Sequence, residues 1–398
     1  MNVCAYIISD KSVKIWGLTP AERLRKILKP FKNLKIIENL DLIKDDDDLV
    51  LLKGDYIYDE RIIKDLFEKK NCALKIKKNL KDSIVAIHTT GKNAYLAYNI
   101  LIKTKPLSEF PELNILTISE LCTLLFHKKL KKVDIPYVLP VNEKNKKLIE
   151  NKLFASSYKG VTDIVTRLVW PPFAYIGTKF CTICGITPNE VTLLSLLLAI
   201  IVGILFIEGH FWTGLLLGWI MTFLDTLDGK LARVTVSSSK IGDILDHGLD
   251  ILHPPYWYIA WGIGTAAIIS ISYTYIIIAL AVIVAFYVIG RILEGLFKML
   301  TDKFNIFCWK PFDSYFRLII ARRNPNLIIL TVSLISGRPD VGLLLVAIWT
   351  TLSSVILFIR LMMAFYIKKT KGHLKSWLEE IDHTTHKNKL TTRLFIYK

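Results

Sequence analysis

The sequence predicts a protein of two parts, a front α/β domain followed by an all-helical domain that crosses a membrane six times. Up to about residue 150, short apolar runs typical of strands alternate with charged helical patterns. After about residue 186 the apolar stretches become long enough to cross a bilayer. The chain is 52% hydrophobic and still carries a formal net charge of +17, which indicates apolar spans with basic flanks.

The front domain is expected over residues 1–150 as a three-layer α/β structure. Its strand-like runs are VCAYII, LKII, DLVLL and SIVAIHTT. The start of the chain lacks the basic region, apolar core and small-residue cleavage site of a signal peptide. We therefore expect the amino terminus in the cytosol.

Residues 151–186 are expected to form an amphipathic helix on the inner leaflet, with a plain linker helix as the alternative. Its aromatic and basic residues would lie at headgroup depth or against anionic lipid: Trp170, Phe173, Tyr175, Arg167 and Lys179. Asn189 is expected to cap the first membrane helix.

Six membrane helices are predicted between residues 187 and 370. They cover residues 190–207, 211–228, 244–269, 273–297, 326–337 and 341–367. The fifth is short and needs residues 318–321 or a tilt to cross. Pro254 and Pro255 are expected to bend the third span, either to widen a cavity or as a structural kink only.

Lysine and arginine in the connections orient these spans. With the amino terminus inside, the outer links hold only Arg338, whereas the inner links and the basic cytosolic tail, residues 371–398, are rich in positive charge. This asymmetry is what the positive-inside rule requires. It predicts a multi-pass protein with both termini in the cytosol.

Four acids mark the functional site. Asp225 and Asp228 are three residues apart and Asp246 and Asp250 are four apart, so each pair can share one face of its helix. Carboxylates at membrane depth are costly unless they are paired or bind cations, which marks them as functional. The predicted topology places them at the cytosolic ends of the second and third spans.

These acids belong to a fixed pattern of eight residues: D, two residues, DG, two residues, AR, eight residues, G, three residues, D, three residues, D. The residues are Asp225, Asp228, Gly229, Ala232, Arg233, Gly242, Asp246 and Asp250. The pattern resembles the signature of the CDP-alcohol phosphotransferases. The resemblance implies a membrane enzyme that passes a substituted phosphate from a CDP-linked donor to an alcohol and releases CMP.

The resemblance also implies roles for these residues. Asp225, Asp228 and Asp246 would bind Mg²⁺ or Mn²⁺, and Asp250, at the same metal site, would act as general base on the acceptor hydroxyl. Hard cations on carboxylates suit the charge of a donor pyrophosphate. The CDP-binding set would be Asp225, Gly229, Ala232, Arg233 and Gly242, in which the small residues allow close approach and Arg233 meets an acid or a phosphate.

An acceptor pocket is expected to draw on basic residues outside the signature: Arg291, Arg322, Arg323 and Arg360. Arg317, Arg322 and Arg323 equally fit a second reading, in which they are positive-inside charges. The acceptor or the donor would be a lipid, in phospholipid or related polar-lipid synthesis.

The front domain resembles a nucleotidyltransferase of the sugar-nucleotide type. Asp55 stands at the Gly-Asp step that holds metal in such domains, and Arg23 follows the first loop. The Gly-rich phosphate loop, however, is replaced by SDKSVKIWG, which has only Gly17. We expect a degenerate docking domain. The fusion also resembles bifunctional enzymes that make CDP-inositol and then transfer inositol phosphate, so retained transferase activity is the alternative.

Other classes of protein are separated from this reading by the sequence. No zinc-finger, RRM or helix-turn-helix pattern accompanies the positive charge, so no nucleic-acid partner is expected. An ion transporter would spread its acids along the bilayer depth or repeat them in two halves. A catalytically silent scaffold remains a third reading, and a homodimer is an open assembly.

Overall fold

The computed structural model describes residues 3–8, 13–78, 81–122, 125–128, 130–269, 272–301, 304–380 and 390–395. It divides into two compact units. The α/β unit comprises Met1–Leu125, Asp134–Ser156 and Val234–Val236, and the helical unit comprises Phe126–Val133, Ser157–Arg233 and Ser237–Lys398. The short segment Phe126–Val133 therefore leaves the front of the chain to join the helical unit.

A six-stranded mixed sheet forms the centre of the α/β unit, in the order β2-β1-β3-β6-β5-β7. The strands are β1 (Val3–Ile8), β2 (Leu34–Ile37), β3 (Asp48–Lys53), β5 (Cys72–Lys78), β6 (Lys81–Thr90) and β7 (Asn114–Leu116). β1 pairs in parallel with β2 and β3, β6 is antiparallel to β3 and β5, and β7 is parallel to β5. All four apolar runs predicted as strands lie in this sheet.

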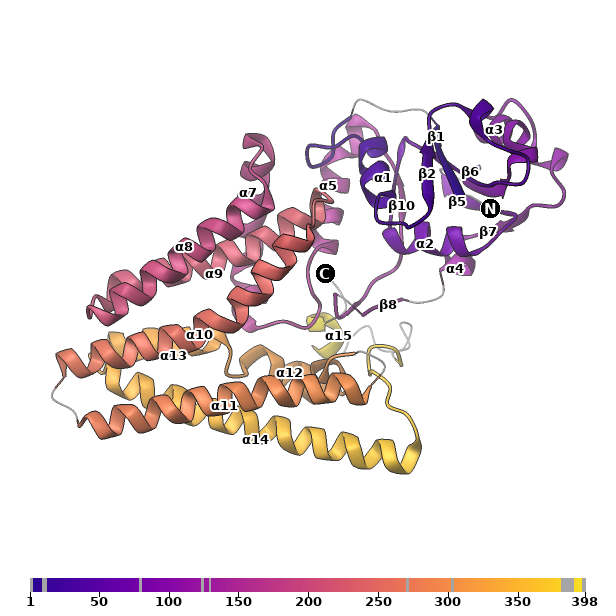
Figure 1. Ribbon diagram of the computed structural model, residues 1–398. Coiled ribbons are helices and arrows are strands. Elements are labelled where there is room, and N and C mark those ends of the chain that lie inside the picture. The colour runs from indigo at the N-terminus through magenta and orange to yellow at the C-terminus, as the bar shows by residue number, and fades with distance from the viewer. Residues whose placement is uncertain are drawn as a thin grey trace. The chain divides into compact units, whose positions relative to one another are not determined.

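Helices cover both faces of the sheet (Figure 1). Helices α1 (Pro20–Leu28) and α2 (Glu60–Glu68) pack on the face that carries Val50 and Leu52. Helix α3 (Ala94–Ile102) packs on the face that carries Leu49 and Leu51. Because successive strand residues point to opposite faces, the apolar run in β3 serves both layers. The predicted α/β character of the front part is confirmed.

Shorter elements complete both units. The α/β unit also contains β4 (Tyr56–Tyr58), β10 (Val138–Pro140), α4 (Ile118–Leu121) and α5 (Lys146–Ser156). The helical unit begins with the hairpin β8 (Phe126–His127) and β9 (Lys132–Val133), then α6 (Ile164–Leu168) and α7 (Trp170–Cys184), and includes α15 (Leu390–Phe395).

Every predicted span corresponds to a helix of the helical unit. The helices are α8 (Pro188–Ile207), α9 (Phe211–Val234), α10 (Lys240–Ile268), α11 (Tyr273–Leu300), α12 (Pro311–Ile319), α13 (Arg323–Ile335) and α14 (Pro339–Lys371). By length and composition, α8, α11 and α14 could each cross a membrane, and α12 with α13, bent by 43°, could form a fourth span. Helices α9 and α10 carry the acids of the signature and are less apolar, so the count of six is not confirmed.

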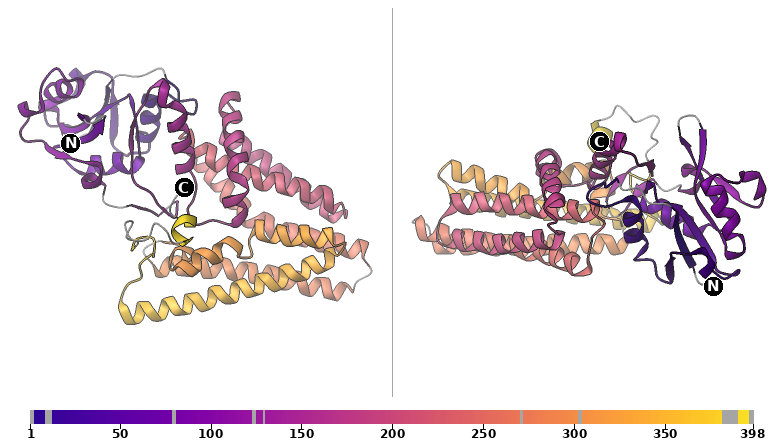
Figure 2. Two further views of the ribbon diagram at one scale, coloured as in Figure 1. Left: turned by 180° about the vertical axis from the view of Figure 1, so that it is seen from behind. Right: turned by 90° about the horizontal axis from the view of Figure 1, so that it is seen from above.

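The long helices pack through small residues and hydrogen-bonded tryptophans. Helix α11 runs along α14, and α10 contacts α8 and α11 (Figure 2). A Cβ on Gly264 would lie 1.9 Å from the carbonyl oxygen of Phe206, so only glycine allows α10 to approach α8 this closely. The indole nitrogens of Trp257 and Trp261 donate to the carbonyls of Ala199 and Pro339.

The outer faces of these helices carry exposed apolar side chains. Examples on α8, α11 and α14 are Leu193, Leu197, Ile200, Ile204, Ile277, Ile278, Val288, Ile292, Leu345, Ile348, Val355 and Phe358. Apolar patches of this extent are rare on proteins surrounded by water and are typical of helices that face lipid.

Two local predictions need correction. Thr187, not Asn189, caps α8, because its hydroxyl accepts the N–H of Glu190 and the Glu190 carboxylate accepts the N–H of Thr187. The Arg167 side chain is buried and donates to the Gly160 carbonyl, so it does not face lipid. Pro254 and Pro255 lie inside α10, and the bend expected there stays a prediction.

Part of the predicted basic tail is packed rather than solvated. Leu374, Trp377 and Leu378 are buried, and the Trp377 indole donates to the Ser314 hydroxyl at 2.9 Å. Phe395 of α15 is buried as well, with ring contacts to Tyr315 and Trp377. The tail therefore covers α12, which leads into α13.

Candidate active site

The signature acids lie on two neighbouring helices of the helical unit. Asp225 and Asp228 belong to α9, and Asp250 belongs to α10. Asp246 lies in α10, but its side chain is outside the described residues. The acids have different surroundings, since the side chain of Asp225 is 11% exposed, that of Asp250 is 53% exposed and Asp228 is buried.

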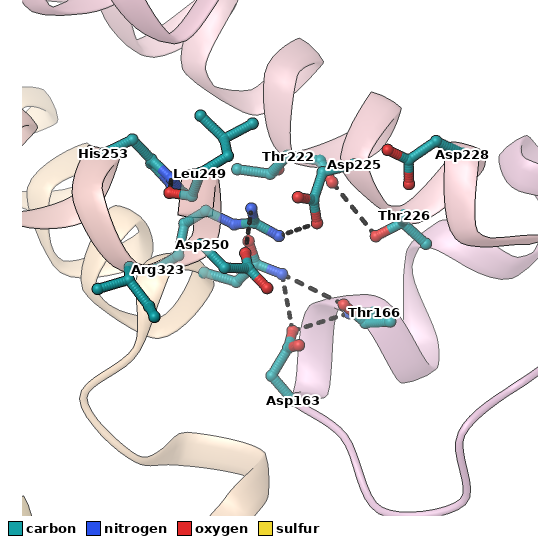
Figure 3. A network of polar contacts seen from close by, with 12 residues as sticks. Asp163, Thr166, Thr222, Asp225, Thr226, Asp228, Leu249, Asp250, His253 and Arg323 are labelled. Carbon is teal, nitrogen blue, oxygen red and sulfur yellow. Dashed lines mark hydrogen bonds and ion pairs between the residues drawn. The ribbon is translucent and has the colours of Figure 1, made fainter. Parts of the chain in front are cut away.

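Arg323, at the start of α13, joins two of these acids (Figure 3). Its Nη2 donates to Asp225 Oδ2 at 2.5 Å and its Nη1 donates to Asp250 Oδ1 at 3.2 Å. One guanidinium thus holds carboxylates from α9 and α10 together. The predicted grouping of Arg323 with Arg291 and Arg322 is corrected, because its guanidinium faces the acids.

Asp228 occupies a separate position on α9, away from Arg323 (Figure 3). Its Oδ2 accepts the hydroxyl of Thr192, on α8, at 2.6 Å. A carboxylate buried in this way is an acceptor fixed in one orientation. The sequence analysis did not single out Thr192. Thr192 lies about one turn into α8, on the face that meets the helix with the acids.

Among the signature acids, Asp225 has the surroundings that best fit a bound cation. Asp225 Oδ1 is buried and has no hydrogen-bond partner among the described residues. An acceptor-only oxygen without a partner suits a cation, since a buried carboxylate is otherwise costly. Among the residues whose side chains the structure describes, which do not include Asp246, no group of three or more acid, histidine or cysteine ligands is brought together. The metal site stays a prediction.

The small signature residues lie where the chain is crowded. A Cβ on Gly229 would lie 3.0 Å from Nη2 of Arg233, so Arg233 folds over its own helix at this point. A Cβ on Gly242 would lie 2.7 Å from Oδ1 of Asn189. Ser239 caps α10 through the Gly242 N–H and donates its hydroxyl to Asn189. Ala232 lies on α9, three residues after Gly229.

A second cluster of charge lies between α11 and α13. Arg291 and Glu294 are 3.7 Å apart on α11, and Arg322 donates to both oxygens of Glu294. Nε of Arg291, Nη1 of Arg317 and Nε of Arg322 are buried without partners among the described residues. Arg317 and Arg322 lie over the Phe307 ring. Three guanidinium groups face Glu294 and, next to Arg317, Asp163, which leaves one excess positive charge and favours an anion.

Arg360, the remaining residue predicted for the acceptor pocket, pairs with an acid outside this cluster. Arg360, on α14, donates to both carboxylate oxygens of Asp313 at 2.6 and 2.8 Å and lies over the Trp309 ring. It is therefore already neutralised by a buried acid. Arg291 and Glu294 instead line a small hollow with Tyr287 and residues of α14.

Asp163 and Asn324 form a contact that the sequence did not predict. Asp163 caps α6 through the Thr166 N–H, and Asn324 Nδ2 donates to the same oxygen at 2.8 Å. Burial alone would raise the pKa of Asp163, but Arg317, the Thr166 N–H and the Asn324 amide together lower it. The pair fixes the backbone next to Arg323. An Asp three residues before Thr is a recognisable helix cap, whereas its long-range partner is not readable from sequence.

The hairpin Phe126–Val133 brings Lys131 toward the second cluster. The N–H groups of Gly160 and Val161 donate to the carbonyls of Leu130 and Lys131. Burial, and then the positive charges of Arg317, Lys159 and Arg322, lower the pKa of Lys131 to about 7, partly offset by Cys308. A lysine with this pKa lies in surroundings that are already positively charged.

The residues predicted as remnants of a nucleotide site lie in the α/β unit. Asp55 follows β3, where the Gly54 N–H donates to the carbonyl of Ile8 at the end of β1. Arg23 is buried on α1, and burial lowers its pKa to about 10. In place of a phosphate loop, Ile15 and Leu18 form a tight turn in which Gly17 has φ +77°.

Trp16, in that turn, is 1% exposed and packs into the interior of the α/β unit. Its indole donates to the Glu150 carbonyl at 3.0 Å and its ring packs on Phe154 of α5. The single glycine of the segment therefore serves the turn and does not free backbone N–H groups for a phosphate.

Comparison with known proteins matches the helical unit. Residues 185–309 match the model of the CDP-alcohol phosphatidyltransferase family. The chain is 27% identical over 183 residues to the archaetidylinositol phosphate synthase of Pyrococcus horikoshii, covering 45% of this chain and 86% of that protein. It is 41% identical over 76 residues to the cholinephosphotransferase 1 of Homo sapiens, covering 16% of this chain and 19% of that protein.

A solved structure, the phosphatidylinositol phosphate synthase of Mycobacterium tuberculosis with CDP-DAG bound, aligns with a TM-score of 0.36 and 19% identity, over 48% of this chain and 93% of that one. Apart from Val234–Val236, the α/β unit lies outside the matched family segment. The chain spans most of the archaeal synthase but only about a fifth of the human transferase. Residues 185–309 thus resemble the CDP-alcohol phosphatidyltransferases, and the relatives belong to the enzyme class that the sequence predicts, transferases of substituted phosphate groups from CDP-alcohols.

Proposed function

We propose that this chain is an integral membrane CDP-alcohol phosphotransferase that cleaves a CDP-linked donor, passes its substituted phosphate to an alcohol acceptor and releases CMP. The observation that carries the proposal is the convergence of Asp225 and Asp250, from two helices of the matched segment, on one point. Phospholipid or related polar-lipid synthesis is its setting, and at least one substrate is a lipid.

The donor site is built on the signature. Asp225, Asp228, Asp246 and Asp250 are proposed as the carboxylates that hold Mg²⁺ or Mn²⁺, which when bound would neutralise the donor pyrophosphate. The buried, unpartnered oxygen of Asp225 supports this role. Gly229 and Gly242 keep the space beside the site free of Cβ atoms, as a nucleotide lying close to the backbone requires.

Asp250 is proposed as the general base. It is the most exposed of the signature acids whose side chains are described, so an acceptor hydroxyl can reach it. When that oxygen attacks phosphorus, its proton passes to the Asp250 carboxylate and CMP departs with the electrons of the broken phosphorus–oxygen bond. Before it can take the proton, Asp250 Oδ1 must lose the hydrogen bond from Arg323 that Figure 3 shows.

The acceptor pocket is proposed at Arg291 and Arg322, joined by Arg317 in place of Arg323. Their buried, unpartnered nitrogens and their one excess positive charge over Glu294 and Asp163 support binding of an acceptor that carries negative charge.

The membrane arrangement proposed is six spans with both termini in the cytosol and the active site at that face. Helices α9 and α10 are counted as spans because they are 24 and 29 residues long and join the packed core of the others. Helix α7 would lie on the inner leaflet, since it exposes Phe173, Ile176, Phe180 and Ile183 on one stripe.

The front domain is proposed as a degenerate nucleotidyltransferase-like domain that docks or recruits. Its sheet with helices on both faces suits that origin, and the buried Trp16 in place of a phosphate loop opposes activity. A bifunctional enzyme that makes its own CDP-alcohol is the second candidate, carried by Asp55 at the carboxyl end of β3.

Purified full-length protein, incubated with labelled CDP-diacylglycerol or CDP-inositol and a panel of alcohol acceptors, tests the proposal. We expect CMP to appear only when a matching donor and acceptor are both present. An ion transporter or a silent scaffold would release no CMP from any combination, and that result would reject the transferase.

A further inference from the structure

The guanidinium of Arg323 is held almost entirely by signature acids. Nη2 contacts Asp225 and Nη1 contacts Asp250, whereas Nε is buried with no partner among the described residues. The side chain is only 14% exposed. Charge-assisted pairs of this kind are strong when they are shielded from water. Two carboxylates that would repel each other are therefore held together by one positive group.

The backbone at Arg323 is fixed by its neighbour. Asn324 is buried and donates to Asp163. Asp163 is itself held by the Thr166 N–H (Figure 3). The start of α13 thus stays in place while the arginine side chain, with its several rotatable bonds, can turn away. The mobile part is the guanidinium, and the anchored part is the helix.

Arg323 holds one oxygen of each carboxylate that a cation would need, while the second oxygen of Asp225, Oδ1, is without a partner among the described residues. Asp225 Oδ2 and Asp250 Oδ1 each hold one nitrogen of the guanidinium. A divalent cation that binds both carboxylates at about 2.1 Å leaves no room for the guanidinium between them. It must also overcome the repulsion of a positive charge that is already present.

We propose that Arg323 is an internal counter-ion that competes with the divalent cation for Asp225 and Asp250 and so sets the cation affinity of the site. The inference rests on the proposed function only in taking these acids as the cation site. The released guanidinium then stands beside bound cation and substrate, where it can meet a phosphate oxygen. Arg323 is a positioning residue in this account, because it acts through the two acids.

Two roles for Arg323 predict opposite effects of its removal on cation binding. If Arg323 only arranges the acids for the cation, its removal weakens binding. If it competes, its removal strengthens binding by about tenfold or more, since at least one charge-assisted hydrogen bond no longer has to be broken. The direction of the change therefore decides between the two roles.

Mn²⁺ binding to the full-length protein in detergent, followed by electron paramagnetic resonance without substrate, measures this affinity. We expect R323Q to bind Mn²⁺ about tenfold or more tightly than the wild type, with R323K between them. R322Q is the matched control, because the neighbouring Arg322 pairs with Glu294 and not with the signature acids. Its Mn²⁺ affinity should equal that of the wild type. An R323Q affinity that is unchanged or weaker overturns the inference.

A second readout covers the case in which R323Q does not fold. Without cation, R323K should melt at a lower temperature than the wild type because one ammonium bridges the two acids less well than a fork of two nitrogens. Saturating Mn²⁺ should close that gap. A gap that persists overturns the inference. Absence of Mn²⁺ binding in the wild type would reject both the cation site and this inference, whereas Mn²⁺-dependent CMP release with unchanged R323Q and R323K affinity would reject this inference alone.

Discussion

At the scale of single residues, acids that the sequence presents as one set have distinct surroundings. Asp228 is buried against Thr192, Asp225 shares Arg323 and keeps one oxygen without a partner, and Asp250 is half exposed. The motif predicts which residues matter, because spacing is written in the sequence. It does not predict their division of labour, since Thr192 and Arg323 come from helices far away along the chain.

Asp250→Asn tests the assignment of the base. The amide keeps the size of the side chain but cannot take a proton, so turnover should fall by about two to four powers of ten. Donor binding, measured by equilibrium dialysis with labelled CDP-donor, should change little. Loss of donor binding in this variant would instead show that Asp250 is needed as a ligand that holds the cation and donor, and the base would then have to be another residue.

Lys131 gives the protein a pH-dependent stability. Its pKa of about 7 in the folded chain lies below the usual lysine value of 10.5, so the unfolded chain binds the extra proton between these values. Stability should therefore rise with pH from about 7 to 10.5. Below pH 7 the full free-energy cost of burying the protonated amine reduces the stability of the fold. The groups that face Lys131 are Cys308, Arg317, Lys159, Arg322 and Glu294.

Thermal melts at pH 7 and pH 9 measure this effect. The gain on raising the pH should be smaller in Lys131→Met than in the wild type, because methionine has no proton to lose. Lys375→Met, at an exposed position of the tail, is the control and should keep the gain of the wild type. Equal gains in Lys131→Met and the wild type would contradict the buried position of the amine.

At the scale of elements, period and composition predict much of the structure and long-range packing limits the rest. All four strand runs and all six membrane segments correspond to elements, because hydrophobic period is a local property. The cap of α8 was placed two residues late, since Thr187 and Glu190 form a reciprocal pair that outweighs Asn189. The break between α12 and α13 and the hairpin at Phe126–Val133 depend on distant partners and were not predicted.

The packed tail is an element whose removal should destabilise the helical unit. Trp377 is buried and bonded to Ser314 of α12, so Trp377→Ala should cost about 3–5 kcal/mol. Denaturation of the purified protein, followed by tryptophan fluorescence and circular dichroism, measures the loss. Lys375→Ala, two residues away and exposed, should have little effect. A Trp377→Ala protein as stable as that control would show that the tail contributes no packing energy.

At the scale of the whole molecule, a helical unit that carries the signature is fused to an α/β unit in which the buried Trp16 opposes nucleotidyltransferase activity. The signature, Asp225 to Asp250, lies entirely in the matched segment. The sequence predicted both parts, since their compositions differ sharply. It also predicted the missing phosphate loop, whereas the filling of that region by Trp16 required the structure.

The front unit should therefore form no CDP-alcohol. Given CTP and phosphorylated alcohols but no CDP-donor, the full chain should release no pyrophosphate, because Gly17 is used in a turn and no glycine-rich loop faces a phosphate. An enzyme-coupled pyrophosphate assay checks this. Pyrophosphate release that disappears in Asp55→Ala would make the protein bifunctional.

The central claim is that the convergent acids of α9 and α10 perform a cation-dependent transfer. The most direct measurement is CMP release by purified protein with a productive donor and acceptor, with Mg²⁺ and with excess chelator, in the wild type and in Asp225→Asn, Asp228→Asn and Asp246→Asn. We predict that the wild type releases CMP only with the cation, and that each variant is inactive because a lost carboxylate removes a ligand. Full activity in chelator, or in any one of these variants, would contradict the account.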